Sequence, residues 1–334
     1  MIKKLYAKIF KLADRNIVKK RLLSGLKTPS YLKEELDIVY GGDSERNRVD
    51  IYYLKKYSHK KLPTIINIHG GGYVAGSKEN LSEYSMKLAE QGYFVLNMEY
   101  TLSEQEGFPK PVFEVFDLFQ FLEKNKDIEE HIDYDHLFLA GDSAGGHIAS
   151  TVANIQCNPS VKERFRVSGG PKISGLILNS PVFGAFRFGN LPIIKRDFEE
   201  IVFGKYAGSK LQSYCQNLDI LTDKFPPTII FSANNDFIRI HDIIFCRKAE
   251  ELGLDVQSYN FVTGKHLGHD FIIYNLSEKE GLFALEKIKA FISDVINDTL
   301  PKGVIKENVN LRKKPKTNVE VVDEARNDIE ENKK

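Results

Sequence analysis

The 334-residue chain contains no tryptophan and only three cysteines. The cysteines are odd in number and lie far apart: Cys157, Cys215 and Cys246. This spacing argues against a disulfide framework and indicates a reducing compartment. The chain also lacks a C-x-x-C pair and close Cys/His spacing, so we expect no zinc site and no other cofactor. An uncharged stretch of the roughly 18 residues that a membrane span needs is also missing, and the N-terminus is too rich in charge for a signal peptide. We therefore expect a cytoplasmic protein.

An excess of one charge is lacking as well, because 47 Lys and Arg residues face 46 Asp and Glu residues. This balance argues against a dedicated nucleic-acid binder. The exception is the N-terminus, where nine basic residues within residues 1–27 stand against Asp14 alone. Apolar residues recur there near helical spacing, so residues 1–36 are predicted to be a basic amphipathic segment. It either packs on its own domain, which we favour, or makes peripheral contact with a membrane through residues 1–27.

Strand-like and helix-like segments alternate between residues 37 and 300, which predicts an α/β domain. Strands are expected at 37–40, 49–54, 64–68, 93–98, 137–140, 173–178, 228–232 and 256–262. Since buried strands that alternate with helices form parallel sheets covered on both faces, the active site should lie at the carboxyl ends of the strands. Residues 183–222 interrupt the alternation and are predicted to be an inserted lid. Residues 301–334 lack aromatic side chains and are dense in charge, which predicts a disordered tail.

The segment from Gly141 to Gly146 reads Gly-Asp-Ser-Ala-Gly-Gly and follows an apolar strand. A serine in a sharp strand-to-helix turn needs neighbours with almost no side chain, and these glycines meet that need. The segment therefore predicts a nucleophile elbow with Ser143 as the nucleophile and Asp142 as supporting motif residue. The pattern alone is weak evidence, because glycine and serine also cluster in ordinary turns.

A serine hydroxyl needs hydrogen-bond donors for the oxyanion that its attack creates. The predicted strand 64–68 runs directly into His69, Gly70, Gly71 and Gly72. Consecutive glycines leave backbone N–H groups accessible to a bound carbonyl oxygen. Gly71 and Gly72, with the amide of Ala144, are therefore the predicted oxyanion hole, and His69 and Gly70 support the motif.

The serine also needs a base and an acid that orients it. The base is expected after the last predicted strand, where His266 and His269 compete, and His269 is favoured because Phe271 can anchor the loop. The acid is expected to be Asp236, which follows the strand 228–232. Asp242 is the alternative, although a solvated helical face explains it better. The order serine, aspartate, histidine is the order of α/β hydrolases.

With these residues in place, the chain resembles the hormone-sensitive-lipase-like family of α/β-hydrolase carboxylesterases. The motifs that carry the resemblance span roughly residues 37–297: His69–Tyr73, Glu99–Tyr100, Phe108–Pro109, Asp117, Gly141–Gly146, Pro226–Pro227, Asp236 and His269–Phe271. The resemblance implies an α/β-hydrolase fold with a mostly parallel sheet of eight strands, helices on both faces, and a helical cap built from the N-terminal segment and the insertion. Asp270 departs from the pattern, since a glycine commonly follows the catalytic histidine. Tyr100–Ser103 and Phe237–Arg239 also differ from the usual loops.

These observations predict a serine hydrolase that cleaves small-molecule carboxylic esters of small to medium acyl chains through an acyl-enzyme. An amidase, deacylase or peptidase with the same triad is the nearest alternative. A ligand-binding protein of this fold without turnover is an alternative of another class. No metal or organic cofactor is implied, and the sequence does not indicate an oligomeric state.

Overall fold

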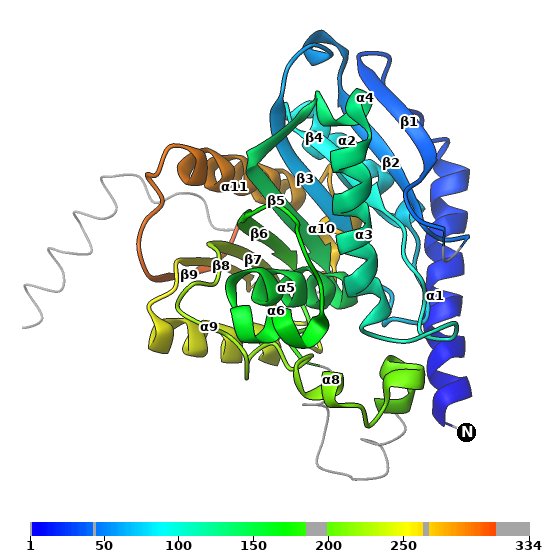
Figure 1. Cartoon of the computed structure of the whole chain (residues 1–334). Coiled ribbons are helices and arrows are strands. Elements are labelled where there is room, and N and C mark those ends of the chain that lie inside the picture. Colours follow the sequence, from blue (N-terminus) through cyan, green and yellow to red (C-terminus); the bar gives the residue numbers. More distant parts are fainter. Residues whose placement is uncertain (1, 43–44, 185–198, 263–266, 312–334) are drawn as a thin grey trace, which may run out of the picture.

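The computed structural model describes residues 2–42, 45–184, 199–262 and 267–311 (Figure 1). Its centre is a nine-stranded sheet with the order β1-β2-β4-β3-β5-β6-β7-β8-β9. The strands are β1 (Leu32–Val39), β2 (Arg48–Leu54), β3 (Leu62–Ile68), β4 (Phe94–Met98), β5 (Ile132–Asp142), β6 (Ile173–Asn179), β7 (Thr228–Ala233), β8 (Val256–Phe261) and β9 (Val304–Val309). Only β2 runs against the others, because it pairs antiparallel with both β1 and β4. The predicted α/β-hydrolase architecture is confirmed.

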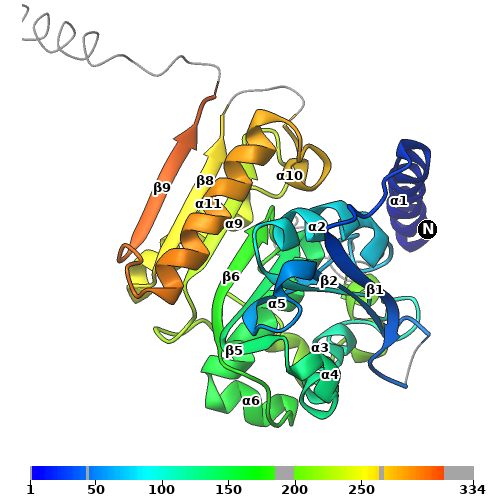
Figure 2. The same cartoon turned by 90° about the horizontal axis from the view of Figure 1, so that it is seen from above.

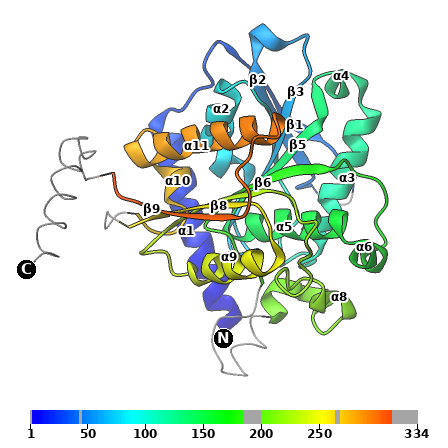
Figure 3. The ribbon, with the colours of Figure 1, turned by 90° about the vertical axis from the view of Figure 1, so that its left-hand side faces the viewer.

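Helices cover both faces of this sheet, so the domain has three layers (Figure 3). One face carries α2 (Ser82–Glu90), α10 (Phe271–Tyr274) and α11 (Lys279–Ile296). The other carries α3 (Lys110–Lys124), α4 (Lys126–Glu129), α5 (Ser143–Cys157), α6 (Pro159–Phe165) and α9 (Ile240–Leu252). Successive strand residues serve opposite cores: Ile65 packs with the first group and Ile66 with the second. This explains why the strands read as continuous apolar runs.

The ninth strand corrects two predictions, the count of eight strands and a tail that begins at residue 301. β9 pairs parallel with β8 at the edge of the sheet (Figure 2). Its middle residues are exposed and charged, and Lys306 pairs with Glu250 on α9 at 2.6 Å. An edge strand needs only backbone bonds on one side, and charged side chains protect it from pairing with other chains. The high charge of this segment, which suggests disorder, is therefore compatible with an edge strand. Residues 312–334 lie outside the described residues.

The N-terminal segment forms a single helix, α1 (Ile2–Ser24), beside α2 and β1 (Figures 1 and 2). Its Tyr6 hydroxyl donates to the Gly72 carbonyl oxygen at 3.2 Å, and Asn80 donates to Asp14 at 2.6 Å. α1 thus packs on its own chain, next to the glycine loop. The sheet begins at Leu32 rather than at residue 37, because β1 extends further toward the N-terminus than its apolar residues indicate. No described helix is both long and apolar enough to cross a membrane.

The described part of the predicted lid comprises residues 183–184 and 199–222 and contains the short helices η3 (Gly204–Tyr206) and α8 (Lys210–Ser213). It is tied to the catalytic domain near the start of α3. The amide of Phe108 donates to the Val202 carbonyl at 2.8 Å, and the Ser103 hydroxyl donates to the same oxygen at 3.0 Å. Residues 185–198 of the predicted lid lie outside the described residues.

Candidate active site

Ser143 stands between the end of β5 and the start of α5, with a backbone φ of +49°. That left-handed conformation is strained for a serine, and its surroundings hold it in place. A Cβ on Gly145 would lie 2.0 Å from the carbonyl oxygen of Ile68, so only glycine lets α5 approach β3 this closely. The structure thus has the strained turn that the glycine spacing predicts, and the serine side chain lines a cavity.

Ser143, His269 and Asp236 come together although they are far apart in the sequence. The serine Oγ lies 2.9 Å from Nε2 of His269. The other ring nitrogen, Nδ1, lies 3.0 and 3.2 Å from the two carboxylate oxygens of Asp236. With Nδ1–H donated to the aspartate, Nε2 of the neutral ring faces the serine hydroxyl, which is the geometry of a serine–histidine–aspartate relay. His266, the alternative base, lies outside the described residues.

Asp236 is held by more than the histidine. The amide of Ile238 donates to its Oδ1 at 2.9 Å, and the side chain is buried. Burial raises the pKa of Asp236, but hydrogen bonds from His269 and Ser180 and the charge of His269 outweigh it, so the pKa lies below the ordinary value. The carboxylate therefore stays ionised and can stabilise an imidazolium.

Asp242, the alternative acid, lies in α9 and is buried, which corrects the expectation of a solvated helical face. Burial raises its pKa well above the ordinary value. Among the described residues, neither carboxyl oxygen of Asp242 has a hydrogen-bond partner, and neither oxygen contacts His269. A neutral carboxyl without contact to the imidazole cannot orient it as Asp236 does.

The glycine loop after β3 lies beside the serine. Gly71 has φ +117° and Gly72 has φ +59°, and both values favour glycine. The Gly70 amide is occupied, because it donates to Oδ1 of Asp142 at 2.9 Å. Within the described parts of the chain, the amides of Gly71 and Gly72 have no assigned acceptor. The Ala144 amide lies in the first turn of α5, where backbone N–H groups lack intrahelical partners.

A buried polar cluster fixes this loop. His69 stacks on Tyr100 with 4.1 Å between ring centres, and its Nε2 lies 2.7 Å from Oε1 of Glu99. Arg46 pairs with the same carboxylate and also donates to the Gly76 carbonyl at 2.8 Å. The glycine loop is therefore anchored, through these side chains, to the residues that directly follow β4 and to the segment that precedes β2.

The cavity at Ser143 has a volume of about 160 Å³ and is walled partly by α1. Lining residues come from α1, the glycine loop, the elbow and the histidine loop: Phe10, Ala13, Asp14, Ile17, His69, Gly70, Gly71, Gly76, Asn80, Leu81, Asp142, Ser143, His269, Asp270 and Tyr274. Five of these side chains are apolar or aromatic, and five carry a carboxyl or imidazole group. α1 is thus part of the site and not only an appendage of the domain.

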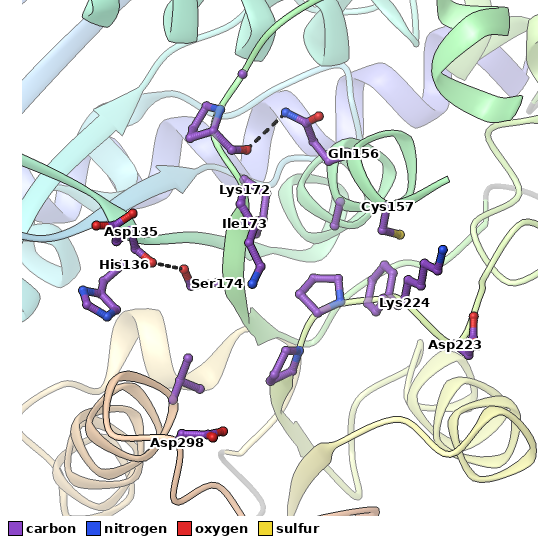
Figure 4. A pocket seen from close by; sticks show the side chains of 17 residues that line it. Asp135, His136, Gln156, Cys157, Lys172, Ile173, Ser174, Asp223, Lys224 and Asp298 are labelled. Atoms are coloured by element: carbon purple, nitrogen blue, oxygen red, sulfur yellow. Dashed lines mark hydrogen bonds between the residues drawn. The ribbon is translucent and has the colours of Figure 1, made fainter. Parts of the chain in front are cut away.

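A larger hollow of about 850 Å³ opens at the opposite ends of the parallel strands (Figure 4). It is lined by the starts of β6 and β7, the end of α11 and the last turn of α5. Two of its polar side chains bond to backbone: Ser174 donates to the Asp135 carbonyl at 2.9 Å and Gln156 to the Pro171 carbonyl at 3.2 Å. No serine, histidine and aspartate relay occurs among the described residues that line it, so the small cavity at Ser143 is the site of chemical interest.

Comparison with known proteins agrees with this geometry. The model of the BD-FAE family matches residues 49–238, which is more than half of the chain. The chain belongs to the BD-FAE family. The match spans the sheet from β2 to β7 and includes the glycine loop, the elbow and Asp236, whereas His269 lies beyond its end.

Individual relatives of this BD-FAE family member are esterases and lipases. An esterase from Gibberella moniliformis is 28% identical over 222 residues, which cover 62% of this chain and 67% of that protein. Hormone-sensitive lipase from Mus musculus is 28% identical over 111 residues, covering 33% of this chain and 14% of the lipase. The crystal structure of inhibited esterase B from Lactobacillus rhamnosis superimposes with a TM-score of 0.79 at 21% identity, covering 89% of this chain and 98% of that one. The structural likeness shows the fold.

Sequence reasoning missed a buried polar chain that supports the site in this BD-FAE member. The Tyr73 hydroxyl donates to Nδ1 of His147 at 2.7 Å, and Nε2–H of His147 donates to the Cys215 carbonyl at 2.7 Å. It connects the residue after the glycine loop, the first turn of α5 and the lid. A histidine directly after Gly146 was the available signal, but spacing alone does not reveal its partners.

Proposed function

We propose that the protein is a serine hydrolase that cleaves carboxylic esters of small to medium acyl chains. The observation that carries the proposal is the continuous relay from Ser143 Oγ through His269 to Asp236, with both contacts at hydrogen-bond distance. The family and the esterase relatives support ester substrates. The relay, the glycine loop and the cavity lie at the carboxyl ends of the parallel strands, where open α/β sheets bind ligands.

In the proposed reaction Ser143 attacks the ester carbonyl while Nε2 of His269 takes the hydroxyl proton. The bond from the acyl carbon to the alcohol oxygen then breaks, and His269 returns the proton to the departing alcohol. Water repeats the sequence on the acyl-enzyme. The amides of Gly71, Gly72 and Ala144 are proposed to stabilise the oxyanion, and losing one such donor typically costs about 100- to 1000-fold in kcat.

The cavity supports short acyl groups. Its volume of about 160 Å³ lies below the roughly 300–1,000 Å³ of sites that enclose drug-sized ligands. A related structure, esterase B from Lactobacillus rhamnosis at 24% identity, is described with a tributyrin phosphonate. We therefore expect kcat/KM to be highest for short p-nitrophenyl esters and to fall along a series from acetate to laurate. A maximum at laurate would contradict the proposed acyl size.

The test of the nucleophile is Ser143→Ala, measured with a short p-nitrophenyl ester and with a fluorophosphonate probe. The variant should lose at least about 10⁴-fold in kcat and all covalent labelling. Parent-level turnover in the variant would reject the assignment. Absence of labelling in the wild-type protein would instead support a ligand-binding protein without turnover. A matched ester and amide pair separates an esterase from an amidase or peptidase.

We further propose peripheral contact of α1 with anionic membranes. Leu5, Ile9 and Leu12 are exposed on one side of the helix, and Lys8 and Lys19 are exposed beside them. Apolar side chains flanked by lysines are typical of interfacial helices. The unpaired cysteines support the cytoplasmic side of such a membrane.

Binding to phosphatidylserine vesicles should weaken as salt rises, because lysine attraction to anionic lipid is screened. It should be lost when Leu5, Ile9 and Leu12 are all replaced by glutamine. Undiminished binding of that variant would reject the contact. Phosphatidylcholine vesicles are the matched control.

A further inference from the structure

Asp270 places a carboxyl group in the active-site cavity that the relay does not use. The residue is 6% exposed, and its Oδ2 lies 3.1 Å from Nε2 of His269. The same nitrogen lies 2.9 Å from Oγ of Ser143. The imidazole therefore has a carboxyl group at each ring nitrogen, Asp236 at Nδ1 and Asp270 at Nε2. Only the first belongs to a serine–histidine–aspartate relay.

The local turn and the following helix do not explain why the carboxyl group of Asp270 is buried beside the imidazole. Asp270 precedes α10 and has φ +55°, but its carboxyl makes no capping hydrogen bond to that helix. Its own amide donates to the Ser180 hydroxyl at 3.2 Å. Within the described parts of the chain, Oδ1 of Asp270 is buried and receives no hydrogen bond from a donor group. An aspartate kept for the turn alone would point to solvent or cap the helix.

The neighbouring carboxyl belongs to Asp142, the residue before the nucleophile. The two side chains are in hydrogen-bonding contact with each other, and Oδ1 of Asp142 also accepts the Gly70 amide at 2.9 Å. Both are buried, and no lysine or arginine occurs among the described residues that line the cavity. Two buried carboxyl groups in contact share a proton near neutral pH, because two negative charges at this distance repel each other.

The protonation of the pair follows from its surroundings. Burial raises the pKa of Asp142 to about 6. Burial and the contact with Asp142 raise the pKa of Asp270 well above its ordinary value. The hydrogen bond from Gly70 favours ionised Asp142, whereas Asp270 lacks such a donor. The imidazole of His269 lies against Oδ2 of Asp270 and favours its ionised form instead, so the pair as a whole holds one proton and one negative charge.

We propose that Asp270 is a further catalytic residue, which with Asp142 keeps one shared proton and one negative charge against Nε2 of His269 and so stabilises the imidazolium relative to the free base. The proposal rests on the serine hydrolase chemistry proposed above. Asp270, the unusual residue after the histidine, would then control the pH at which His269 can activate the serine.

Further titratable groups also face His269 or lie close to it. Asp236 and Asp242 lie on the side of β7 and α9, and Asp14 of α1 and His69 line the cavity. Burial lowers the pKa of His269, but the charges of Asp270, Asp236 and Asp142 outweigh it and raise the pKa to about 9. An imidazolium at neutral pH cannot accept the serine proton, so turnover must rise with pH.

The pair takes no net part in proton transfer. When Ser143 attacks, its proton moves from Oγ to Nε2, and the new Nε2–H can donate to Oδ2 of Asp270 as well as to the leaving oxygen. The C–O bond of the ester breaks, and the proton passes from Nε2 to the alcohol. The proton between Asp142 and Asp270 stays in place, so charge and atoms balance without a further reactant.

The test is the pH dependence of kcat/KM for wild type, Asp270→Gly and Asp270→Asn. Glycine and asparagine are the residues that best tolerate a positive φ, so both variants suit the backbone. In the wild type the acidic limb should lie above the ordinary histidine value of about 6.5. In both variants it should move at least one pH unit lower, which raises the fraction of maximal kcat/KM at pH 6 about tenfold. Glu104→Gln, which removes an exposed carboxylate paired with Lys11, should leave the limb unchanged.

Variants that are folded and active with the wild-type acidic limb would overturn the proposal. So would an NMR titration of wild-type His269 that gives a pKa at or below 6.5, a result that needs no variant. Failure of the hydrolase assignment looks different, because wild type would then lack serine-dependent turnover at every pH.

Discussion

His147 provides the sharpest link between a buried group and a measurable property. Its ring is buried, with Tyr73 donating to Nδ1 and Nε2–H donating to the Cys215 carbonyl. A protonated ring would need an acceptor at Nδ1, where the Tyr73 hydroxyl now donates. Burial lowers the pKa of His147 to about 4. The folded protein therefore holds this histidine neutral.

The free energy of unfolding must consequently depend on pH. The ordinary histidine pKa is 6.5, so the unfolded chain takes up a proton as the pH falls below that value, while the folded chain does so only near 4. The stability is present above 6.5 and is lost as the pH falls toward about 4. The full loss is about 3 kcal/mol, from about 2.5 pKa units at 1.36 kcal/mol each. Between pH 7 and pH 5 the loss is about 2 kcal/mol.

The assay is reversible urea unfolding of wild type and His147→Gln at pH 7 and pH 5. Glutamine keeps a donor and an acceptor but does not titrate, so the variant should be about 1–3 kcal/mol less stable at pH 7 and less sensitive to acid. The pH 7 to pH 5 loss should be about 2 kcal/mol smaller in the variant than in wild type. His59→Gln, at an exposed histidine, controls for histidine removal in general. Equal losses for wild type and His147→Gln would refute the reasoning.

Two further substitutions test the relay and the elbow. Asp236→Asn should lower kcat about 10⁴-fold, because the amide fixes the wrong tautomer of the base. Asp242→Asn replaces a neutral carboxyl by a neutral amide, so its kcat should stay within about tenfold of wild type in the same ester assay. Equal losses would reject Asp236 as the orienting acid. Gly145→Ala would bring a Cβ within 2.0 Å of the Ile68 carbonyl oxygen and should lower the thermal stability by about 3 kcal/mol, while Gly42→Ala, which has open space around it, should change the unfolding midpoint little. Wild-type stability of the Gly145 variant would contradict the close approach of α5 to β3.

The sequence predicts the central fold well because buried parallel strands leave a strong signal. Continuous apolar runs locate β3 to β8, and the glycines of the elbow report a backbone contact that only glycine allows. β9 escapes this reasoning, since an edge strand is stabilised by backbone bonds to one neighbour and can carry charged side chains. Segments held by backbone pairing alone have no side-chain pattern to read.

Side-chain partners were harder to predict than elements. The order of Ser143, Asp236 and His269 could be read from the ends of predicted strands, because those ends meet at one edge of the sheet. The contact between Asp270 and the imidazole could not, since it depends on the direction of a side chain within a loop. The burial of Asp242 could not be predicted for a similar reason: Ile240 and Ile243, at the start of its helix, are exposed, so the apolar residues there do not mark the buried face.

The third glycine of the loop links the catalytic centre to a helix about 60 residues earlier. A Cβ on Gly72 would lie 2.6 Å from a ring carbon of Phe10 and 2.7 Å from the Tyr6 hydroxyl. Both obstacles belong to α1, and neither belongs to the catalytic relay. Substitutions at Gly72 and in α1 should therefore be coupled: the loss of activity caused by a side chain at position 72 should be partly suppressed by Phe10→Ala. Divergence in α1 would then ease the steric part of the requirement for glycine at position 72, whereas the part set by its φ of +59° would remain.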